Sequence, residues 1–383
     1  MTIRLSLIYA AIFLFIGVLL PFWPVWLKSR GMDAAEIGII LSIGMWVRAV
    51  SSPLTAHFAD STGRRRPIIV ALGWATLAGY CLFVVADGFW ALAAVTVLVA
   101  MLFSPMLPLV DTVTLHNVQE KELDYGRIRL WGSLTFIAAA TGGGVMLAGR
   151  DERIILWMIL GALVLAALAA LVVPEARVTP KSRPGAGRRA PLIEVLSDGR
   201  YLAFLLAASL VQASHAVYYG FATLYWRESG HSDVVIGVLW AEGVIAEIVL
   251  FAFSGAVVAR LGPARLLALA AVAGIVRWSA LGMTTALPVL VLVQGLHAFT
   301  FGAAHLAIMH FITRHVPPEV AATAQSLYSS TAMGVMMGAA TLGSGWLYAA
   351  YSGTAFFAAS LVSLAALIIV AMLYRPASTA SRS

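Results

Sequence analysis

Charge is scarce in this chain. Of its 383 residues, 61% are hydrophobic and only 11% are charged, and the mean hydropathy is +0.91. A water-soluble protein of this length needs more charge to cover its surface. The composition therefore excludes an ordinary soluble protein and predicts a protein embedded in a lipid bilayer.

Cysteine and catalytic motifs are missing as well. The single cysteine, Cys81, lies inside an apolar run, which excludes a disulfide framework and a cysteine-ligated metal cluster. The sequence contains no glycine-rich nucleotide loop and no catalytic triad. We therefore expect no enzyme activity, no catalytic residues, no metal, no cofactor and no ATP-driven transport. The net charge of +7 is spread over loops, so it indicates membrane topology rather than a nucleic-acid partner.

What the chain has instead is a series of long apolar segments. About 20 such residues cross a bilayer as a helix, so the sequence predicts an all-α integral membrane protein with twelve transmembrane helices. The expected helices cover residues 5–28, 35–58, 66–86, 89–115, 128–149, 153–173, 200–226, 234–258, 264–283, 287–312, 320–348 and 352–374. The first apolar run lacks a small-residue cleavage site, so we expect a helix there rather than a signal peptide.

Positive charge is distributed unevenly between the two ends of these helices. With a cytoplasmic N-terminus, the cytoplasmic segments hold 18 of the 25 Lys and Arg residues and the opposite segments hold five. This asymmetry predicts that both termini are cytoplasmic. A link rich in proline, glycine and arginine, residues 174–199, would join two six-helix halves, residues 1–173 and 200–383.

The two halves match one another at a constant offset of 199 residues. Matched pairs include Phe22 and Phe221, Lys28 and Arg227, Gly31 and Gly230, and Gly63 and Gly262. The same offset places Arg48 opposite Glu247. Parallel repeats of six helices are typical of major facilitator transporters. We therefore expect a substrate site near the bilayer midplane, between halves that open alternately to each side.

The loop after the second predicted helix supports this architecture. Its sequence, AHFADSTGRRRP, resembles the major facilitator motif Gly-x-x-x-Asp-x-x-Gly-Arg, with Asp60, Gly63 and Arg64 in their places. Glycine permits a tight reversal, and Asp60 can cap a helix end or pair with an arginine. We expect these residues, together with Arg48, to act in gating rather than in substrate binding.

Longer stretches carry a more specific resemblance over essentially the whole chain. LPFWPVWLKSRG, YGRIRLWGSLTFI, QASHAVYYGFATLYW and QGLHAFTFGAAHLA are similar to the phenylpropionate permease group of the major facilitator superfamily, a relative of lactose permease-type proton symporters. The resemblance implies a multi-pass permease of the cell inner membrane that imports aromatic monocarboxylates such as 3-phenylpropionate together with protons. Its partners would be this small molecule, the proton and the lipid bilayer, and a monomer is sufficient for this mechanism.

The resemblance to lactose permease also implies site residues. The family's helix-four acid, helix-five arginine and stacking aromatic fall on Asp111, Arg129 and Phe136. Its helix-nine arginine and helix-ten histidine, twenty residues apart, fall on Arg277 and His297. An alternative for Asp111 and Arg129 is a structural or gating ion pair at the cytoplasmic ends of their helices.

Ionisable residues inside apolar segments are costly and mark solute or proton pathways. Arg277 offers a planar fork for a substrate carboxylate, and a permanent salt bridge to Glu247 or Glu242 is the alternative. Where lactose permease has a proton-carrying glutamate, this chain has Thr300. The proton is therefore expected on Glu247, His297 or Glu242.

Together these patterns predict a permease for a small organic anion, driven by proton symport. Arg277 would hold the carboxylate, and Phe22, Phe136 and Phe221 would flank an aromatic ring. The alternatives are proton symport of a neutral sugar or nucleoside, efflux of drugs or metabolites by proton antiport, and a sensor or scaffold that does not transport.

Overall fold

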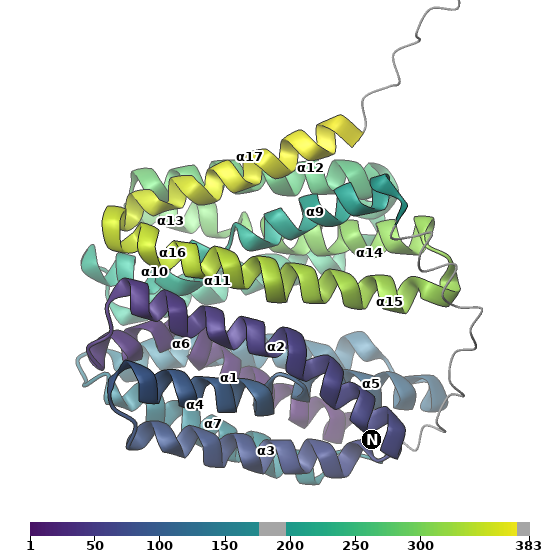
Figure 1. Ribbon diagram of the computed structural model, residues 1–383, viewed down its shortest axis with the longest axis horizontal. Coiled ribbons are helices and arrows are strands. Elements are labelled where there is room, and N and C mark those ends of the chain that lie inside the picture. The colour runs from purple at the N-terminus through teal and green to yellow at the C-terminus, as the bar shows by residue number, and fades with distance from the viewer. Residues whose placement is uncertain (176–196, 374–383) are drawn as a thin grey trace, which may run out of the picture. The chain divides into compact units, whose positions relative to one another are not determined.

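The computed structural model describes residues 1–175 and 197–373. The predicted link, residues 174–199, therefore lies largely outside the described residues. Every regular element within the described ranges is a helix, which confirms the predicted all-α class (Figure 1).

The first part of the described chain contains seven α-helices and one short 3-10 helix. They are α1 (Thr2–Ser29), α2 (Ala34–Thr62), α3 (Arg65–Cys81), η1 (Leu82–Val84), α4 (Gly88–Phe103), α5 (Met106–Lys121), α6 (Tyr125–Leu147) and α7 (Arg153–Leu171). The second part continues with α9 (Gly199–Ala213), α10 (Ala216–Glu228), α11 (Asp233–Ala252), α12 (Ser254–Met283), α13 (Leu287–Gln294), η3 (Ala298–Ala303), α14 (Ala304–His315), α15 (Pro318–Tyr328), η4 (Ser329–Met336), α16 (Met337–Tyr351), η5 (Ser352–Ala355) and α17 (Phe356–Leu373).

Eleven helical stretches of the described chain are long and apolar enough to cross a membrane. Ten of them correspond to the first ten predicted helices. The eleventh, Thr323–Leu373, has 51 residues, more than twice the length that one crossing needs. It covers the region in which the eleventh and twelfth helices were predicted.

One predicted boundary differs from the structure. The eighth helix was expected over residues 234–258, but α11 ends at Ala252, and α12 starts at Ser254 and runs to Met283. Gly262 interrupts α12 with φ 70° and ψ 171°, and Pro263 follows it. Glycine adopts a positive φ without the steric penalty of a Cβ, so the chain bends at Gly262, within residues 259–263, where the break between the eighth and ninth helices was predicted.

Contacts between residues divide the chain into two units. Unit 1 comprises Met1–Arg183, Tyr218–Val244 and Thr341–Ser352, and unit 2 comprises Pro184–Val217, Ile245–Ala340 and Gly353–Ser383. Unit 1 thus includes two segments from the second half of the sequence. The division into halves 1–173 and 200–383 remains a prediction.

Small residues let the helices of each unit approach closely. In unit 1, α1 packs along α6 and α7 (Figure 1), and a Cβ at Gly17 would lie 2.8 Å from the backbone oxygen of Phe136. In unit 2, α12 packs along α17, and a Cβ at Gly274 would lie 2.5 Å from Ser363 Oγ. Lipid tails are as apolar as leucine, so such close packing, rather than the hydrophobic effect, holds membrane helices together.

Two glycine contacts attach the later segments to the rest of unit 1. A Cβ at Gly38 of α2 would lie 2.7 Å from the Gly345 Cα atom of α16. A Cβ at Gly237 of α11 would lie 2.3 Å from the Ala140 carbonyl oxygen of α6. Because a side chain fits at neither position, both helix pairs depend on glycine for this approach.

Glycines paired by the sequence repeat share a positive φ angle. Gly31 and Gly230 have φ angles of 83° and 89°, and Gly63 and Gly262 have φ angles of 65° and 70°. L side chains rarely adopt this region of backbone space. The repeat thus specifies a positive φ at both matched places, although ψ differs within the second pair, at 7° for Gly63 and 171° for Gly262.

Candidate functional site

Unit 2 contains a buried polar network around Arg277 of α12, whose side chain has no exposed surface. Its Nη1 donates to His297 Nδ1 at 2.9 Å and to Thr300 Oγ1 at 3.0 Å, and its Nη2 donates to Gln294 Oε1 at 2.8 Å. The guanidinium carbon lies 4.7 Å from the ring centre of Trp278. The structure therefore brings into contact Arg277 and His297, which were paired in the sequence by their spacing of twenty residues.

The network extends to a second histidine and to an acid. His215 Nε2 lies 3.0 Å from Thr300 Oγ1, and its Nδ1 lies 3.1 Å from two carbonyl oxygens of the preceding turn. At the other end, His297 Nε2 lies 3.9 Å from Glu247 Oε2. A chain of polar side chains thus runs from Glu247 through His297, Arg277 and Thr300 to His215.

Donors and acceptors decide which ring nitrogens carry protons. A carbonyl oxygen only accepts, so His215 Nδ1 carries a hydrogen, and a neutral His215 accepts at Nε2 from Thr300. A guanidinium only donates, so His297 Nδ1 accepts from Arg277, and the proton of a neutral His297 lies on Nε2, toward Glu247. A second proton on His297 would lie on Nδ1, and this N–H group would then face an N–H group of Arg277. Protonation of His297 therefore requires that its contact with Arg277 breaks.

The helices that carry this network are interrupted beside it. Ser214 and His215 separate α9 from α10, and α13 ends at Gln294. The π-helical segment η3 (Ala298–Ala303) begins directly after His297. Short π segments and broken helices leave the regular backbone hydrogen-bond pattern and occur frequently at functional sites of membrane proteins.

A cavity of about 260 Å³ lies in unit 1. Its walls come from α1, α2, α3, α4, α5, α10 and α16, and most of the lining residues are apolar. Four aromatic side chains contribute to the walls: Trp23, Tyr80, Phe103 and Tyr219. Arg48 of α2 is the single Lys, Arg, His, Asp or Glu residue among the described lining residues.

The three phenylalanines expected to flank a substrate ring lie in helix contacts and do not line this cavity. Phe22 is fully buried and lies against Gly143. Phe221 stacks on Tyr348 with ring centres 4.7 Å apart. Phe136 is buried where α6 contacts α1. Aromatic surface reaches the cavity from other positions instead.

Asp111 and Arg129 are connected through aromatic rings. Asp111 accepts a short hydrogen bond from Tyr9 and one of 3.3 Å from Tyr125. The Arg129 guanidinium lies 5.5 Å from the ring centre of Tyr9 and 4.0 Å from that of Phe13. Neither charged residue lines the cavity. This arrangement favours the structural or gating interpretation of the two residues.

The predicted gating loop is ordered by Asp60 and Gly63. Asp60 pairs with Arg65 at 2.5 Å, whereas Arg64 is exposed. Gly63, with φ 65°, ends α2 and donates its N–H to the Ala59 carbonyl at 3.0 Å. Arg48, which was grouped with this loop, lies in the middle of α2 and lines the cavity.

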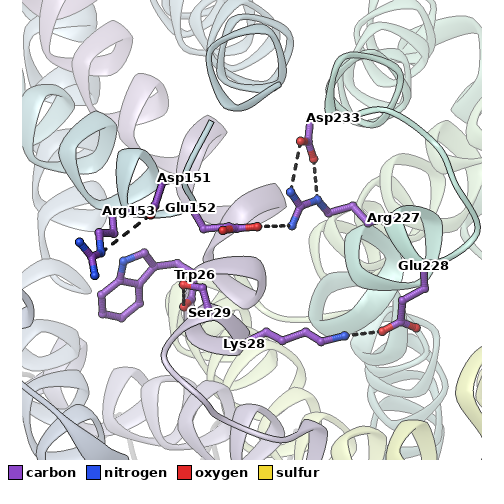
Figure 2. Close-up of polar contacts among 9 residues, drawn as sticks. All are labelled: Trp26, Lys28, Ser29, Asp151, Glu152, Arg153, Arg227, Glu228 and Asp233. Carbon is purple, nitrogen blue, oxygen red and sulfur yellow. Dashed lines mark hydrogen bonds and ion pairs between the residues drawn. The ribbon is translucent and has the colours of Figure 1, made fainter. Parts of the chain in front are cut away.

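An ion-pair cluster at the end of α1 was missed from the sequence (Figure 2). Lys28 Nζ lies 2.5 Å from Glu228 Oε1. Figure 2 shows Arg227 between two acids, Glu152 at 3.2 Å and Asp233 at 2.8 Å. The Lys28–Glu228 and Glu152–Arg227 pairs each join the first half of the sequence to the second within unit 1. The repeat already matched Lys28 with Arg227, and this was the signal available in the sequence.

Comparison with known proteins gives the family. Residues 2–359 match the MFS_1 like family. The chain belongs to this family. A probable 3-phenylpropionic acid transporter of Escherichia coli (strain K12) is 36% identical over 375 residues, which cover 95% of this chain and 96% of that protein. The maltose permease of Geobacillus stearothermophilus is 27% identical over 379 residues, which cover 98% and 95% of the two chains. The predicted resemblance to phenylpropionate permeases of the major facilitator superfamily is therefore confirmed.

Solved structures show the same fold. A crystal structure of a mutant of the nucleoside transporter NupG has a TM-score of 0.88 at 16% identity and covers 98% of this chain and 100% of that one. A bacterial homologue of the human lysosomal transporter Spinster, inward-facing and unoccupied, has a TM-score of 0.71 at 16% identity, with 97% and 94% covered. The MFS_1 like protein is thus a multi-pass inner-membrane transporter with a major facilitator fold.

Proposed function

We propose that this MFS_1 like protein imports a small aromatic monocarboxylate, such as 3-phenylpropionate, together with a proton. The observation that carries the proposal is the 36% identity, over 95% of the chain, to a probable 3-phenylpropionic acid transporter. A mostly apolar cavity with aromatic walls and a single arginine fits an anion with an apolar body.

Proton coupling is assigned to His297 and Glu247. Neutral His297 accepts from Arg277 and directs its remaining proton toward Glu247, 3.9 Å away. An arriving proton displaces the guanidinium from Nδ1, so the protonation state of His297 sets the position of Arg277. Glu242, half-buried in α11, is the alternative proton carrier.

Arg277 is assigned to coupling in this proposal. Three neutral side chains, His297, Thr300 and Gln294, accept its hydrogen bonds. Direct binding of a substrate carboxylate by Arg277, as expected from the sequence, would require an exchange of these partners. Such an exchange can follow protonation of His297, which would tie substrate binding to proton uptake.

The membrane arrangement completes the proposal. Twelve crossings follow if the 51-residue stretch Thr323–Leu373 crosses the bilayer twice. Both termini then face the cytoplasm, and the ion pairs of Lys28 and Arg227 lie at the opposite side. Alternating access would break the pairs that join the two sequence halves whenever that side opens, and a monomer suffices for this cycle.

Two driving forces distinguish the proposal from its main alternative. One proton moved with one monoanion carries no net charge, so only the pH gradient drives uptake, at about 1.4 kcal/mol per pH unit. A neutral sugar moved with a proton also gains about 2.3 kcal/mol per 100 mV of membrane potential. The 27% identity to a maltose permease favours sugar symport as the second candidate.

Uptake into proteoliposomes under separately imposed gradients tests the proposal. A pH gradient, acidic outside, should drive accumulation of labelled 3-phenylpropionate, and a membrane potential alone should not. Accumulation of maltose driven by the potential would establish the second candidate instead. Proton-driven expulsion of either compound would establish efflux by antiport and refute import.

A further inference from the structure

Arg48 occupies the middle of a membrane-spanning helix. Fourteen residues separate it from each end of α2 (Ala34–Thr62), or about 21 Å at 1.5 Å per residue. At this depth its side chain is too far from either interface to snorkel to water. A charge near the bilayer centre costs about 2.5–3.5 kcal/mol even on insertion scales, so such residues normally serve a solute or proton pathway.

No acidic side chain accompanies Arg48 among the described residues that line the cavity. Arg48 is exposed and lines the cavity, and within the described ranges no hydrogen bond or ion pair engages it. Its helix face supports this placement, because Leu41, Gly44 and Met45 line the same cavity at helical spacing. A Cβ at Gly44 would meet only a Thr96 methyl group, at 3.8 Å, so space remains one helical turn from Arg48.

Two hydroxyl groups of the lining are also without partners among the described residues. Tyr80 is 5% exposed, and no hydrogen bond engages its hydroxyl. Thr341 is 2% exposed, and its Oγ1 has no hydrogen-bond partner. Two further lining hydroxyls, those of Thr96 and Ser104, donate to carbonyls of the preceding helical turn at 2.8 Å and 2.6 Å. Buried polar groups normally have a hydrogen-bond partner. The hydroxyl groups of Tyr80 and Thr341 therefore indicate a ligand that supplies polar atoms.

The residues that line the cavity restrict the size and polarity of the rest of the ligand. Trp23, Tyr80, Phe103 and Tyr219 present aromatic surface, and the remaining lining is largely aliphatic. Pockets for drug-sized molecules measure about 300–1,000 Å³, so a cavity of about 260 Å³ suits a smaller solute. Such a solute needs one anionic group for Arg48 and an apolar body, of one ring or similar size, for the walls.

We propose that Arg48 binds the substrate carboxylate in this cavity and that the site selects monocarboxylates with an apolar, preferably aromatic, body. The inference rests on the proposed function and assigns its anion-binding residue. A planar guanidinium can donate two parallel hydrogen bonds to a carboxylate. The unpartnered hydroxyl groups of Tyr80 and Thr341 are available to the same ligand.

Selectivity follows from the charges that the cavity lacks. No acidic side chain is present among the described lining residues, so an amino acid would leave its ammonium group unpaired in an apolar space. Phenylalanine, which is 3-phenylpropionate with an α-amino group, should therefore bind at least about tenfold more weakly. A second carboxylate on the ligand would likewise find no cation. The uncharged 3-phenylpropionamide would leave Arg48 without its counter-ion.

Calorimetric titration of the purified full-length protein tests the assignment. Wild type, Arg48→Gln and Arg48→Lys are each titrated with 3-phenylpropionate and with 3-phenylpropionamide. Arg153→Gln, which removes an arginine that is 78% exposed, is the matched control. Size-exclusion profiles and thermal unfolding confirm that each variant is folded.

Arg48→Gln should weaken 3-phenylpropionate binding by about tenfold or more, because a hydrogen bond to a charged group is lost. Its affinity for 3-phenylpropionamide should not fall, which separates anion recognition from a structural role. Arg48→Lys should recover part of the affinity, because it keeps the charge but loses the planar fork.

Two results would overturn the assignment in distinguishable ways. If wild type binds 3-phenylpropionate and Arg48→Gln retains its preference for the acid over the amide, the carboxylate is held elsewhere and only this inference fails. If Arg277→Gln, and not Arg48→Gln, lost the preference for the acid over the amide, Arg277 would be the residue that holds the carboxylate. If wild type binds no aromatic monocarboxylate, the proposed function fails together with the inference.

Discussion

The Glu152–Arg227 ion pair gives a direct test of how one end of the MFS_1 like protein opens. Arg227 contacts two acids, but Asp233 follows it within six residues, whereas Glu152 belongs to the first half of the sequence. Glu152→Gln therefore removes one of the two described pairs that join the halves and leaves the local Arg227–Asp233 pair in place. Asp233→Asn makes the reverse change and serves as the matched control.

Exposure sets the size of the effect. The Arg227 and Glu152 side chains are 28% and 35% exposed, so their pair should contribute about 1 kcal/mol, the upper end for pairs at a surface. Losing it should raise the fraction of molecules open at this end about fivefold. Lys28 and Glu228 are 52% and 41% exposed, so Lys28→Gln should have a smaller effect, about twofold.

Distances between spin labels measure this opening. Cys81 is the single cysteine, so Cys81→Ser gives a cysteine-free background. Labels at the exposed positions Arg150 and Val234 report on the end that carries the cluster. Glu152→Gln should increase the population at longer distances, and Asp233→Asn should not. Equal shifts in both variants, or no shift in Glu152→Gln, would refute the idea that this pair opposes opening.

Two further predictions concern coupling and packing. His297→Gln keeps an acceptor for Arg277, but its side chain cannot be protonated. Vesicles that contain this variant should therefore lose substrate accumulation driven by a pH gradient and keep substrate exchange. Accumulation at the wild-type level would exclude His297 as the proton site. Gly237→Val places a side chain against the Ala140 carbonyl, and it should lower the thermal unfolding temperature by several degrees. Gly161→Val, at a helix position with open space around it, is the control and should change that temperature much less.

Local composition explains what the sequence predicted well. A run of about 20 apolar residues forms a membrane helix almost regardless of its surroundings, because the bilayer forces backbone groups to pair within the helix. The cost of burying charge likewise drew attention to Arg277 and His297. Their hydrogen bond could not be predicted from spacing alone, because it depends on the π segment that follows His297.

Long-range packing explains what the sequence did not predict. The cavity is built from helices as far apart in the chain as α1 and α16, so no local pattern marks its walls. Arg48 was grouped with the gating loop because its partners could not be identified. Phe22 and Phe221 were chosen by their symmetry, but each is buried in a helix contact. Glu152 lies at the start of an apolar segment. Nothing in the sequence distinguishes a functional acid at this position from an acid that merely begins a helix.

Electroneutral symport is tested by recording whether protons enter vesicles together with the substrate. Proteoliposomes loaded with a pH-sensitive dye are given 3-phenylpropionate outside at equal pH, while the membrane current is recorded. Electroneutral symport should acidify the interior without net current, because one proton and one monoanion enter together. Substrate entry with no acidification, or acidification accompanied by an inward current, would contradict electroneutral symport.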